Sequence, residues 1–129
     1  MRALIADDEG SSPVEFVLVG TLLTVLTLAV LQLGLSVYVR NVVHDAAVEG
    51  AYHAALADVP TTQGAVRAEA IVARSVGDGI VQSAAARESI RLGHPTIEVT
   101  VVATLPLLGL LGLPGALEVT GHAPAETLD

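Results

Sequence analysis

The four histidines are the residues best suited to acid–base or metal chemistry, because the chain contains no cysteine. His44 and His53 are nine positions apart in a predicted helix, so they lie about 180° apart around its axis and cannot share a metal ion. His94 falls in a predicted turn and His122 near the end of a predicted strand. We expect each of them at the surface, and no metal site is predicted.

The common catalytic motifs do not occur in the sequence. It has no H-E-x-x-H zinc motif, no G-x-S-x-G nucleophile motif, no phosphate-binding glycine loop with a lysine and no EF-hand loop. Six basic residues against 14 acidic ones give a formal net charge of −8, which argues against nucleic acid as a partner. We therefore expect a protein that is not an enzyme and needs no cofactor.

The most informative polar residue is an acid beside a long apolar run. Residues 17–39 contain no charge, and as a helix they would extend about 34 Å, enough to cross the hydrocarbon core of a membrane. Glu15 directly precedes this run, within V-E-F-V-L-V. A carboxylate near hydrocarbon is costly and indicates a functional site with a partner. The alternative is a position among the lipid headgroups, where the acid favours the positive end of the helix dipole.

A buried core helix and a cleaved secretory signal are the alternatives for the apolar run. So small a domain could hardly cover every face of such a helix. A secretory signal requires a basic start, a shorter apolar stretch and a nearby small-residue cleavage site. Here acids outnumber the one arginine before the run, and no such site follows closely. We therefore predict a membrane span that is retained.

The residues before the span resemble the processing site of type IV pilins. In D-E-G-S-S-P-V-E-F a short polar leader ends at Gly10, and Glu15 follows five positions later, directly before Phe16. The short leader is similar to the class III signal of tight-adherence pilus proteins. This resemblance implies that a prepilin peptidase cuts between Gly10 and Ser11 on the cytoplasmic side. Glycine suits such a site because its backbone can lie close to protease groups, and Pro13 suits a first helical turn.

The same resemblance implies a role in assembly for Glu15 and Phe16. When apolar helices stack, the Glu15 carboxylate can meet the new N-terminal ammonium group of a neighbouring subunit. Such a desolvated pair serves mainly to fix register, because a mispaired charge is strongly penalised.

The helix is expected to continue beyond the span with an amphipathic face. Apolar residues recur there at intervals of three and four positions, with small side chains at the centre of the face: Val39, Val42, Val43, Ala46, Ala47, Gly50, Ala51, Ala54 and Ala55. Small residues four positions apart allow close backbone approach, which predicts helix packing at Ala47, Gly50, Ala51 and Ala54. One helix is expected over residues 14–56, ending before Pro60.

This stretch carries the second part of the resemblance. A span that ends in G-L-S-V-Y-V-R, followed by A-A-V-E-G-A, resembles the TadE family of tight-adherence pseudopilins over residues 9–55. Many relatives have arginine after E-G-A, where this chain has Tyr52 and His53. The resemblance implies a minor pilin or pseudopilin of a type IV pilus for cell adhesion. Its implied partners are other pilin subunits, prepilin peptidase, a membrane platform protein, a cytoplasmic ATPase and the lipid bilayer.

The expected location is the plasma membrane, with one span and a small domain on the extracytoplasmic side or in a surface pilus. This orientation follows from the resemblance alone, because the charges flanking the span give no bias. The alternative function is an uncleaved, signal-anchored membrane protein whose outer domain is a protein-binding scaffold.

The rest of the chain predicts a small α+β domain with a short antiparallel sheet. Ile97, Val99 and Val101 alternate with other residues, as in a sheet covered on one face. The expected elements are a helix at 61–76, a segment at 80–86 that fits helix or strand, and strands at 89–92, 96–104 and 116–122. With three aromatic residues in the whole chain, this domain is expected to depend on the long helix or on a partner.

An apolar segment, L-P-L-L-G-L-L-G-L-P-G-A-L, occupies residues 105–117. It is too short and too interrupted by proline and glycine to span a membrane. We expect a loop packed on the long helix, and the alternative is an exposed apolar patch that contacts partners or the outer face of the bilayer. The predicted organisation is a leader (1–10), a long helix (11–57) and the α+β domain (58–129).

Overall fold

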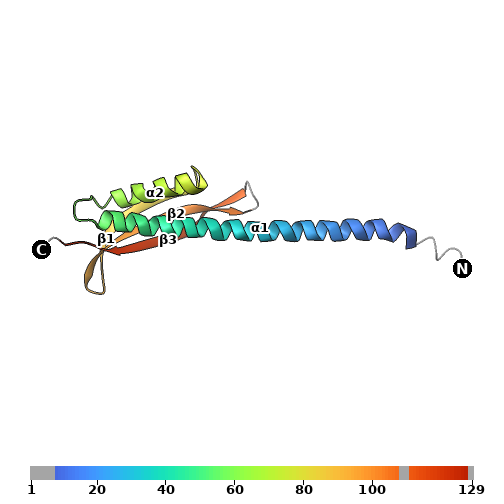
Figure 1. Ribbon diagram of the computed structural model, residues 1–129, viewed down its shortest axis with the longest axis horizontal. Helices are drawn as coiled ribbons and strands as arrows, with labels where there is room; N and C mark the ends of the chain where they lie inside the picture. The colour runs from blue at the N-terminus through green and yellow to red at the C-terminus, as the bar shows by residue number, and fades with distance from the viewer. Residues whose placement is uncertain (1–7, 108–110, 128–129) are drawn as a thin grey trace. The chain divides into compact units, whose positions relative to one another are not determined.

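The computed structural model describes residues 8–107 and 111–127. Two helices precede three strands, and the α+β class predicted from the sequence is confirmed (Figure 1). The elements are α1 (Asp8–Ala55), α2 (Gln63–Val76), β1 (Val81–Arg91), β2 (His94–Leu107) and β3 (Leu111–Pro124). The chain divides into two compact units between Gly34 and Leu35.

The first unit contains the apolar half of α1. Apart from the half-buried Gln32, every residue from Gly10 to Gly34 is exposed. The hydroxyls of three threonines each donate a hydrogen bond of 2.8 Å to the carbonyl oxygen four residues earlier: Thr21, Thr24 and Thr27. These bonds satisfy the hydroxyl groups within the helix, which lipid requires because it offers polar groups no other partner. The helix is long and apolar enough to cross a membrane and is not buried by the rest of the chain, so the alternative of a buried core helix is wrong.

The long helix begins earlier than the sequence predicted. It starts at Asp8 in place of residue 14, and Pro13 therefore lies inside it. The proline ring removes only one backbone donor, the one that would bond to the Glu9 carbonyl oxygen, and does so near the start of the helix, where few hydrogen bonds are formed. The other end, at Ala55, agrees with the prediction to within one residue.

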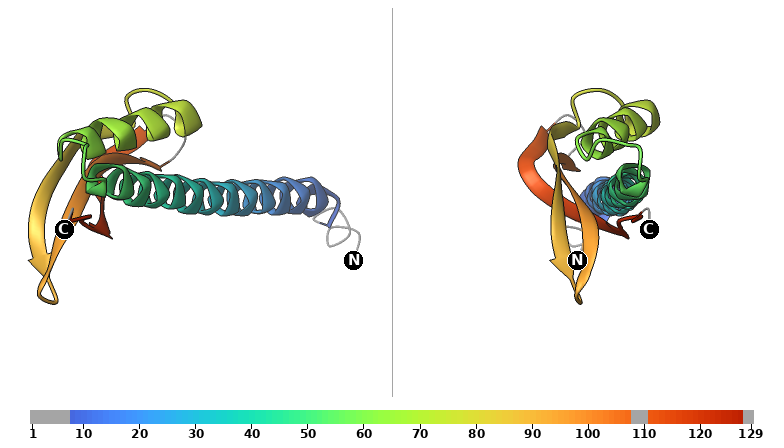
Figure 2. Two further views of the ribbon diagram at one scale, coloured as in Figure 1. Left: turned by 60° about the vertical axis from the view of Figure 1, so that its left-hand side comes forward. Right: turned by 90° about the vertical axis from the view of Figure 1, so that its left-hand side faces the viewer.

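In the second unit, two helical segments cover one face of the sheet (Figure 2). The amphipathic face predicted for α1 is confirmed, since eight of its nine residues are buried and Val42 is half-buried. The buried residues of α2 are Gly64, Ala68 and Val72. Because α1 supplies so much of the core, the compact unit begins at Leu35, within the long helix.

The sheet is antiparallel, with β2 in the centre of the order β1-β2-β3. The predicted alternation on β2 is confirmed, because Ile97, Val99 and Val101 are buried under the helices. The segment that fitted helix or strand is mostly strand, since β1 begins at Val81. Ala84 and Ala86 each match either pattern, and their pairing with Val101 and Val99 decides between them.

The apolar segment at 105–117 is not a loop at its two ends. The β2–β3 ladder continues through Leu105↔Leu113, Pro106↔Gly112 and Leu107↔Leu111, and residues 108–110 lie outside the described residues. Two prolines are tolerated here because one belongs to an edge strand and the other follows the last pair between β2 and β1, Val81↔Ala103. The segment does contact the long helix, since the Ser36 hydroxyl donates to the Pro106 carbonyl oxygen (3.3 Å).

Candidate assembly site on the long helix

The predicted processing site lies in the first turn of α1. Gly10 and Ser11 are both exposed, and a methyl group added at Gly10 would meet no atom within 4 Å. The bond between them is therefore accessible but helical. A protease that binds extended backbone requires this turn to open.

Pro13 weakens the turn that contains this bond. A proline inside a helix cannot donate to the carbonyl oxygen four residues earlier, which here belongs to Glu9. The first four backbone N–H groups of a helix also lack intrahelical acceptors. Few hydrogen bonds therefore resist opening between Asp8 and Pro13.

Glu15 and Phe16 lie one turn further along, and both are exposed. Phe16 is 80% exposed, although aromatic side chains carry the largest apolar area of any residue. Glu15 has no hydrogen bond or ion pair with any residue that the structure describes. Ser11 and Glu15 are four positions apart, which places them on the same face of the helix. An amine created at Ser11 would thus share a face with a carboxylate.

The small residues predicted for helix packing are all buried within this chain. Ala47, Gly50, Ala51 and Ala54 contribute to the core of the second unit. A methyl group at Gly50 would collide with the Gly64 carbonyl oxygen of α2. One added at Gly121 of β3 would collide with the backbone of Ala47. These residues therefore bring α1 close to α2 and β3 of the same chain.

The sequence analysis missed Gly64 and Gly121 as packing residues. A glycine inside a helix costs about 1 kcal/mol relative to alanine, so Gly64 in the first turn of α2 could have indicated a close contact. A glycine within a strand carries a similar signal. In both cases the partner is distant in sequence, so the signal does not identify it.

The three aromatic residues of the chain all lie on the surface of α1. Tyr38 is 51% exposed and Tyr52 is 56% exposed, and like Phe16 neither belongs to the core. Fourteen positions separate the two tyrosines, which places them on nearly the same helical face. That face lies away from the buried alanines. The core is left to alanine, valine, leucine and isoleucine.

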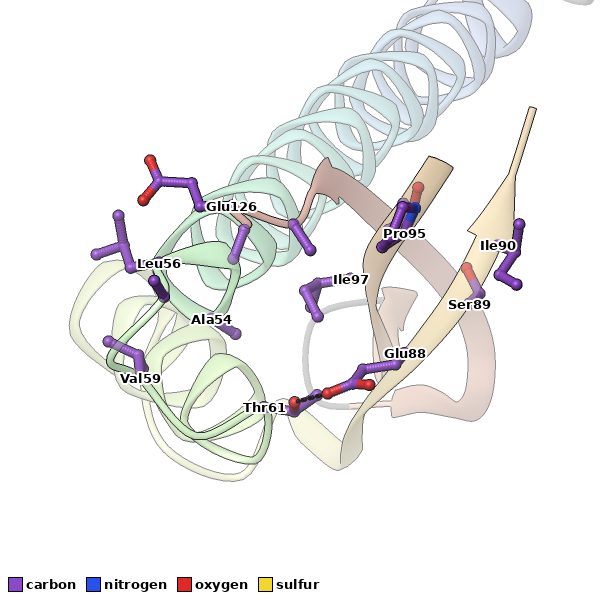
Figure 3. Close-up of a pocket in the computed structure, with 14 residues that line it drawn as sticks. Ala54, Leu56, Val59, Thr61, Glu88, Ser89, Ile90, Pro95, Ile97 and Glu126 are labelled. Atoms are coloured by element: carbon purple, nitrogen blue, oxygen red, sulfur yellow. Dashed lines mark hydrogen bonds between the residues drawn. The ribbon is translucent and has the colours of Figure 1, made fainter. Parts of the chain in front are cut away.

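A cleft of about 330 Å³ lies where α1 ends (Figure 3). Ile97 and Pro95 of β2 line it together with the loop after α1, and the Thr61 hydroxyl donates to the Glu88 carboxylate at its edge (3.0 Å). No histidine lines this cleft. Among residues 8–107 and 111–127, no group of three or more acidic or histidine side chains could hold a metal ion.

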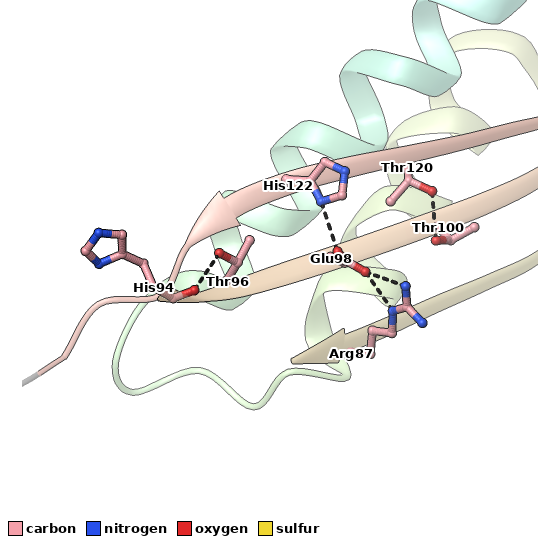
Figure 4. A network of polar contacts seen from close by, with 7 residues as sticks. All are labelled: Arg87, His94, Thr96, Glu98, Thr100, Thr120 and His122. Carbon is pink, nitrogen blue, oxygen red and sulfur yellow. Dashed lines mark hydrogen bonds and ion pairs between the residues drawn. The ribbon is translucent and has the colours of Figure 1, made fainter. Parts of the chain in front are cut away.

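A polar network crosses the other face of the sheet (Figure 4). Arg87 of β1 contacts the Glu98 carboxylate of β2 at 2.6 and 2.7 Å, and Nδ1 of His122 on β3 lies 3.5 Å from it. The hydrogen bond from Arg87 holds the pKa of Glu98 below its ordinary value, more than burial raises it. The Glu98 side chain is only 12% exposed. The network links all three strands, and its role is therefore to stabilise the sheet.

The four histidines lie at separate places in the structure and do not form a cluster among the described residues. His44 and His94 are exposed, as predicted, whereas His53 and His122 are half-buried. His122 departs furthest from the prediction because it lies beside Glu98, its neighbour in the ladder. This contact depends on strand pairing, which a single histidine in the sequence does not reveal.

Comparison with known proteins identifies one segment, which covers about a third of the chain. Residues 10–51 match the family model described as TadE-like protein. No curated protein and no solved structure matches the chain. The matched segment runs from Gly10 through Glu15 and the apolar run to Ala51, and it supports a pilus-associated function at the level of the family. The resemblance found in the sequence is thereby confirmed, and residues 10–51 are similar to TadE-like proteins, the pseudopilins of the tight-adherence pilus.

Proposed function

We propose that this protein is a TadE-like pseudopilin of a tight-adherence pilus, a structural or assembly subunit without catalytic activity. One observation carries the proposal. The segment that matches the family coincides with a helix whose apolar first half is left uncovered by the rest of the chain. Exposed apolar surface of this extent requires lipid or other apolar helices. A bilayer before assembly and neighbouring pilin helices after it meet that requirement.

Processing is the first step of the proposed function. Prepilin peptidase hydrolyses the peptide bond between Gly10 and Ser11. The oxygen of water completes the new carboxylate of Gly10, and a proton completes the new amine of Ser11. The exposure of both residues and the weak first turn of α1 support this step. The span stays attached to the outer domain.

Assembly then uses the new amine. On the same helical face one turn along, the Glu15 carboxylate has no partner among the described residues and is available to the ammonium group of an adjacent subunit. In a low-dielectric environment a correctly placed pair is tolerated and a misplaced charge is not, which sets the register of the helices. A platform protein and a cytoplasmic ATPase drive insertion of the subunit, and the small α+β domain that follows the span lies on the extracytoplasmic side.

The test is co-expression of the full chain with active or inactivated prepilin peptidase. Intact mass and N-terminal sequencing should find a chain beginning at Ser11 only with the active enzyme. Gly10→Ala should reduce this conversion, whereas Gly20→Ala, at another exposed glycine with no neighbour within 4 Å, should not. A full-length chain beside a peptidase that cleaves its own known substrate would overturn the processing step.

An uncleaved, signal-anchored scaffold is the second candidate. The observation that favours it is the helical state of the Gly10–Ser11 bond, which protects a peptide bond from a protease. In that case the helix still anchors the chain, and the outer domain alone carries the binding function. The sequencing experiment separates the two candidates directly.

A further inference from the structure

The β1–β2 hairpin projects beyond the two helical segments that cover the rest of the sheet (Figure 2). On the helix-facing side of β1, Ala84 and Ala86 are half-buried and pack against the core, whereas Ile90 further along the strand is 81% exposed. The same change occurs on β2, where Ile97 is buried and Pro95 is exposed. The end of this hairpin therefore carries apolar side chains that α1 and α2 leave uncovered.

The turn of the hairpin contains a leucine in a backbone conformation that leucine rarely adopts. Arg91 and His94 form the last pair of the ladder, so Leu92 and Gly93 make a two-residue loop, with φ angles of 52° and 82°. Such loops favour asparagine, aspartate or glycine at the first position, because the left-handed conformation is costly for other residues. Leu92 is also 94% exposed. Neither turn geometry nor core packing accounts for this leucine, and backbone strain of this kind clusters at functional sites.

The tip of the hairpin, residues 90–93, combines this leucine with a positive charge. Residues 89–95 read S-I-R-L-G-H-P and contain one arginine and no acid, in a chain with a net charge of −8. Arg91 has no ion pair with any residue that the structure describes, whereas Arg67 and Arg87 are both paired with glutamates. The tip therefore presents two apolar side chains beside a cation that is available to an acidic partner.

The cleft at the end of α1 has the complementary character. Its walls include Ala54, Leu56 and Ile97, and the acids Glu88 and Glu126 lie at opposite edges (Figure 3). The residues that the structure places along this cleft include no lysine or arginine. Its volume of about 330 Å³ exceeds that of an apolar cavity of about 150 Å³ that accepts benzene. A leucine side chain and part of a neighbouring residue therefore fit within it.

We propose that two copies of this chain pair through their hairpins, with Leu92 of each copy in the cleft of the other and Arg91 near the acids at its edges. The tip and the cleft adjoin in one chain, because Ile90 lines the cleft and lies two residues from Leu92. A single two-fold axis can therefore form both contacts at once, which limits the assembly to a pair. The contact needs no cleavage at Gly10, so the inference goes beyond the function proposed above.

Cross-linking between two differently tagged full chains tests the proposal. The chain contains no cysteine, so one chain receives His94→Cys beside the tip and the other Leu56→Cys in the cleft, at a residue that is 45% exposed. After co-expression and treatment of isolated membranes with a short bismaleimide, we expect a covalent product that carries both tags.

The matched control replaces the cleft cysteine by one elsewhere on the same domain. Val66→Cys lies at an exposed apolar residue of α2 that does not line the cleft. Paired with His94→Cys, it should give several-fold less of the doubly tagged product than Leu56→Cys gives. Equal yields from the two pairs, or no product from either, would overturn the contact.

Leu92→Asn separates the contact from folding. Asparagine adopts the left-handed conformation readily and suits this turn, so the variant should unfold at a temperature equal to or above that of the parent. The substitution removes the apolar side chain, and the yield of doubly tagged product should fall several-fold when both chains carry it. An unchanged yield would contradict the proposal.

A charge exchange tests the pairing of Arg91 with the cleft. Arg91→Glu in the chain with His94→Cys should lower the yield, and Glu126→Arg in the chain with Leu56→Cys should restore it. Glu126 is exposed, and its bond to the Ala55 carbonyl oxygen uses the backbone N–H, so its side chain can be exchanged. A yield that stays low in the exchanged pair would overturn the inference. That failure would leave the proposed function intact, because the peptidase experiment measures cleavage alone.

Discussion

Gly50 of α1 and Gly64 of α2 meet backbone to backbone where the two helices cross. A methyl group on Gly50 would overlap the Gly64 carbonyl oxygen, and one on Gly64 would lie 2.9 Å from the Gly50 oxygen and from Cγ2 of Val99. The obstacles include backbone atoms, which cannot move aside as a flexible side chain does. This contact sets the separation of the helices over the sheet.

Gly50→Ala should therefore destabilise the domain. Alanine gains about 1 kcal/mol of helix propensity, but overpacking of a close contact costs typically 1–3 kcal/mol, and a collision with backbone belongs at the upper end. We expect a net loss of about 1–2 kcal/mol of unfolding free energy. Urea unfolding of the full chain in detergent micelles, followed by circular dichroism, measures this change.

Gly34→Ala is the matched control for that experiment. It lies in the same helix, and a methyl group there would meet no atom within 4 Å. The variant should be as stable as the parent or slightly more so. Equal effects at Gly34 and Gly50 would show that helix propensity, and not the contact with Gly64, determines the result.

Pro13→Ala should slow processing. Alanine restores the backbone donor in the early part of α1 and lowers the population of the open turn that a protease requires. A several-fold lower rate of conversion to the Ser11 form, measured by mass spectrometry with purified peptidase, is expected. Val14→Ala, which changes no backbone donor, is the control. An unchanged or faster rate in Pro13→Ala would mean that the turn need not open.

Glu15→Gln should block assembly without preventing membrane insertion or processing. The amide has nearly the shape of the carboxylate but cannot form an ion pair with a neighbouring ammonium group. Pilus counts by electron microscopy, with membrane fractionation of the same cells, measure both properties. Glu69→Gln, at an exposed acid on α2, should assemble normally. Normal pili in Glu15→Gln would remove the role assigned to this carboxylate.

Glu98→Gln should lower stability at neutral pH and have less effect in acid. Because Arg87 holds the pKa of Glu98 below its ordinary value near 4.5, the charged form stabilises the fold. That stabilisation is present above the unfolded-state pKa and is lost as pH falls through the lower folded-state pKa. Thermal unfolding of both proteins between pH 3 and about pH 7 measures the difference.

Arg87 provides the control for this pH dependence. Arg87→Gln should reproduce much of the neutral-pH loss, because Arg87 is the main partner of the carboxylate. The double variant should lose little more than either single one, since the pair acts as a unit. Fully additive losses would show that the two residues stabilise the sheet independently.

Local patterns were sufficient to predict the long helix and its two kinds of surface, one exposed and apolar and the other buried in the core. An uncharged run of residues 17–39 and the three- and four-residue spacing that follows are properties of neighbouring residues, and both appear in α1 as exposed and buried surfaces. The candidate site at Gly10 and Glu15 was found for the same reason, because its spacing lies within one segment. The alternation around Val99 similarly predicted which face of β2 is buried.

The tertiary structure alone decided the features that depend on distant partners. Residues 80–86 became largely strand because β2 offers them a ladder, and residues 105–107 and 111–113 pair across a hairpin in place of the expected loop. Gly64 and Gly121 contact α1 only after the chain has folded. Periodicity records which face of an element is apolar, whereas the element that covers this face is selected by contacts between residues far apart in the sequence.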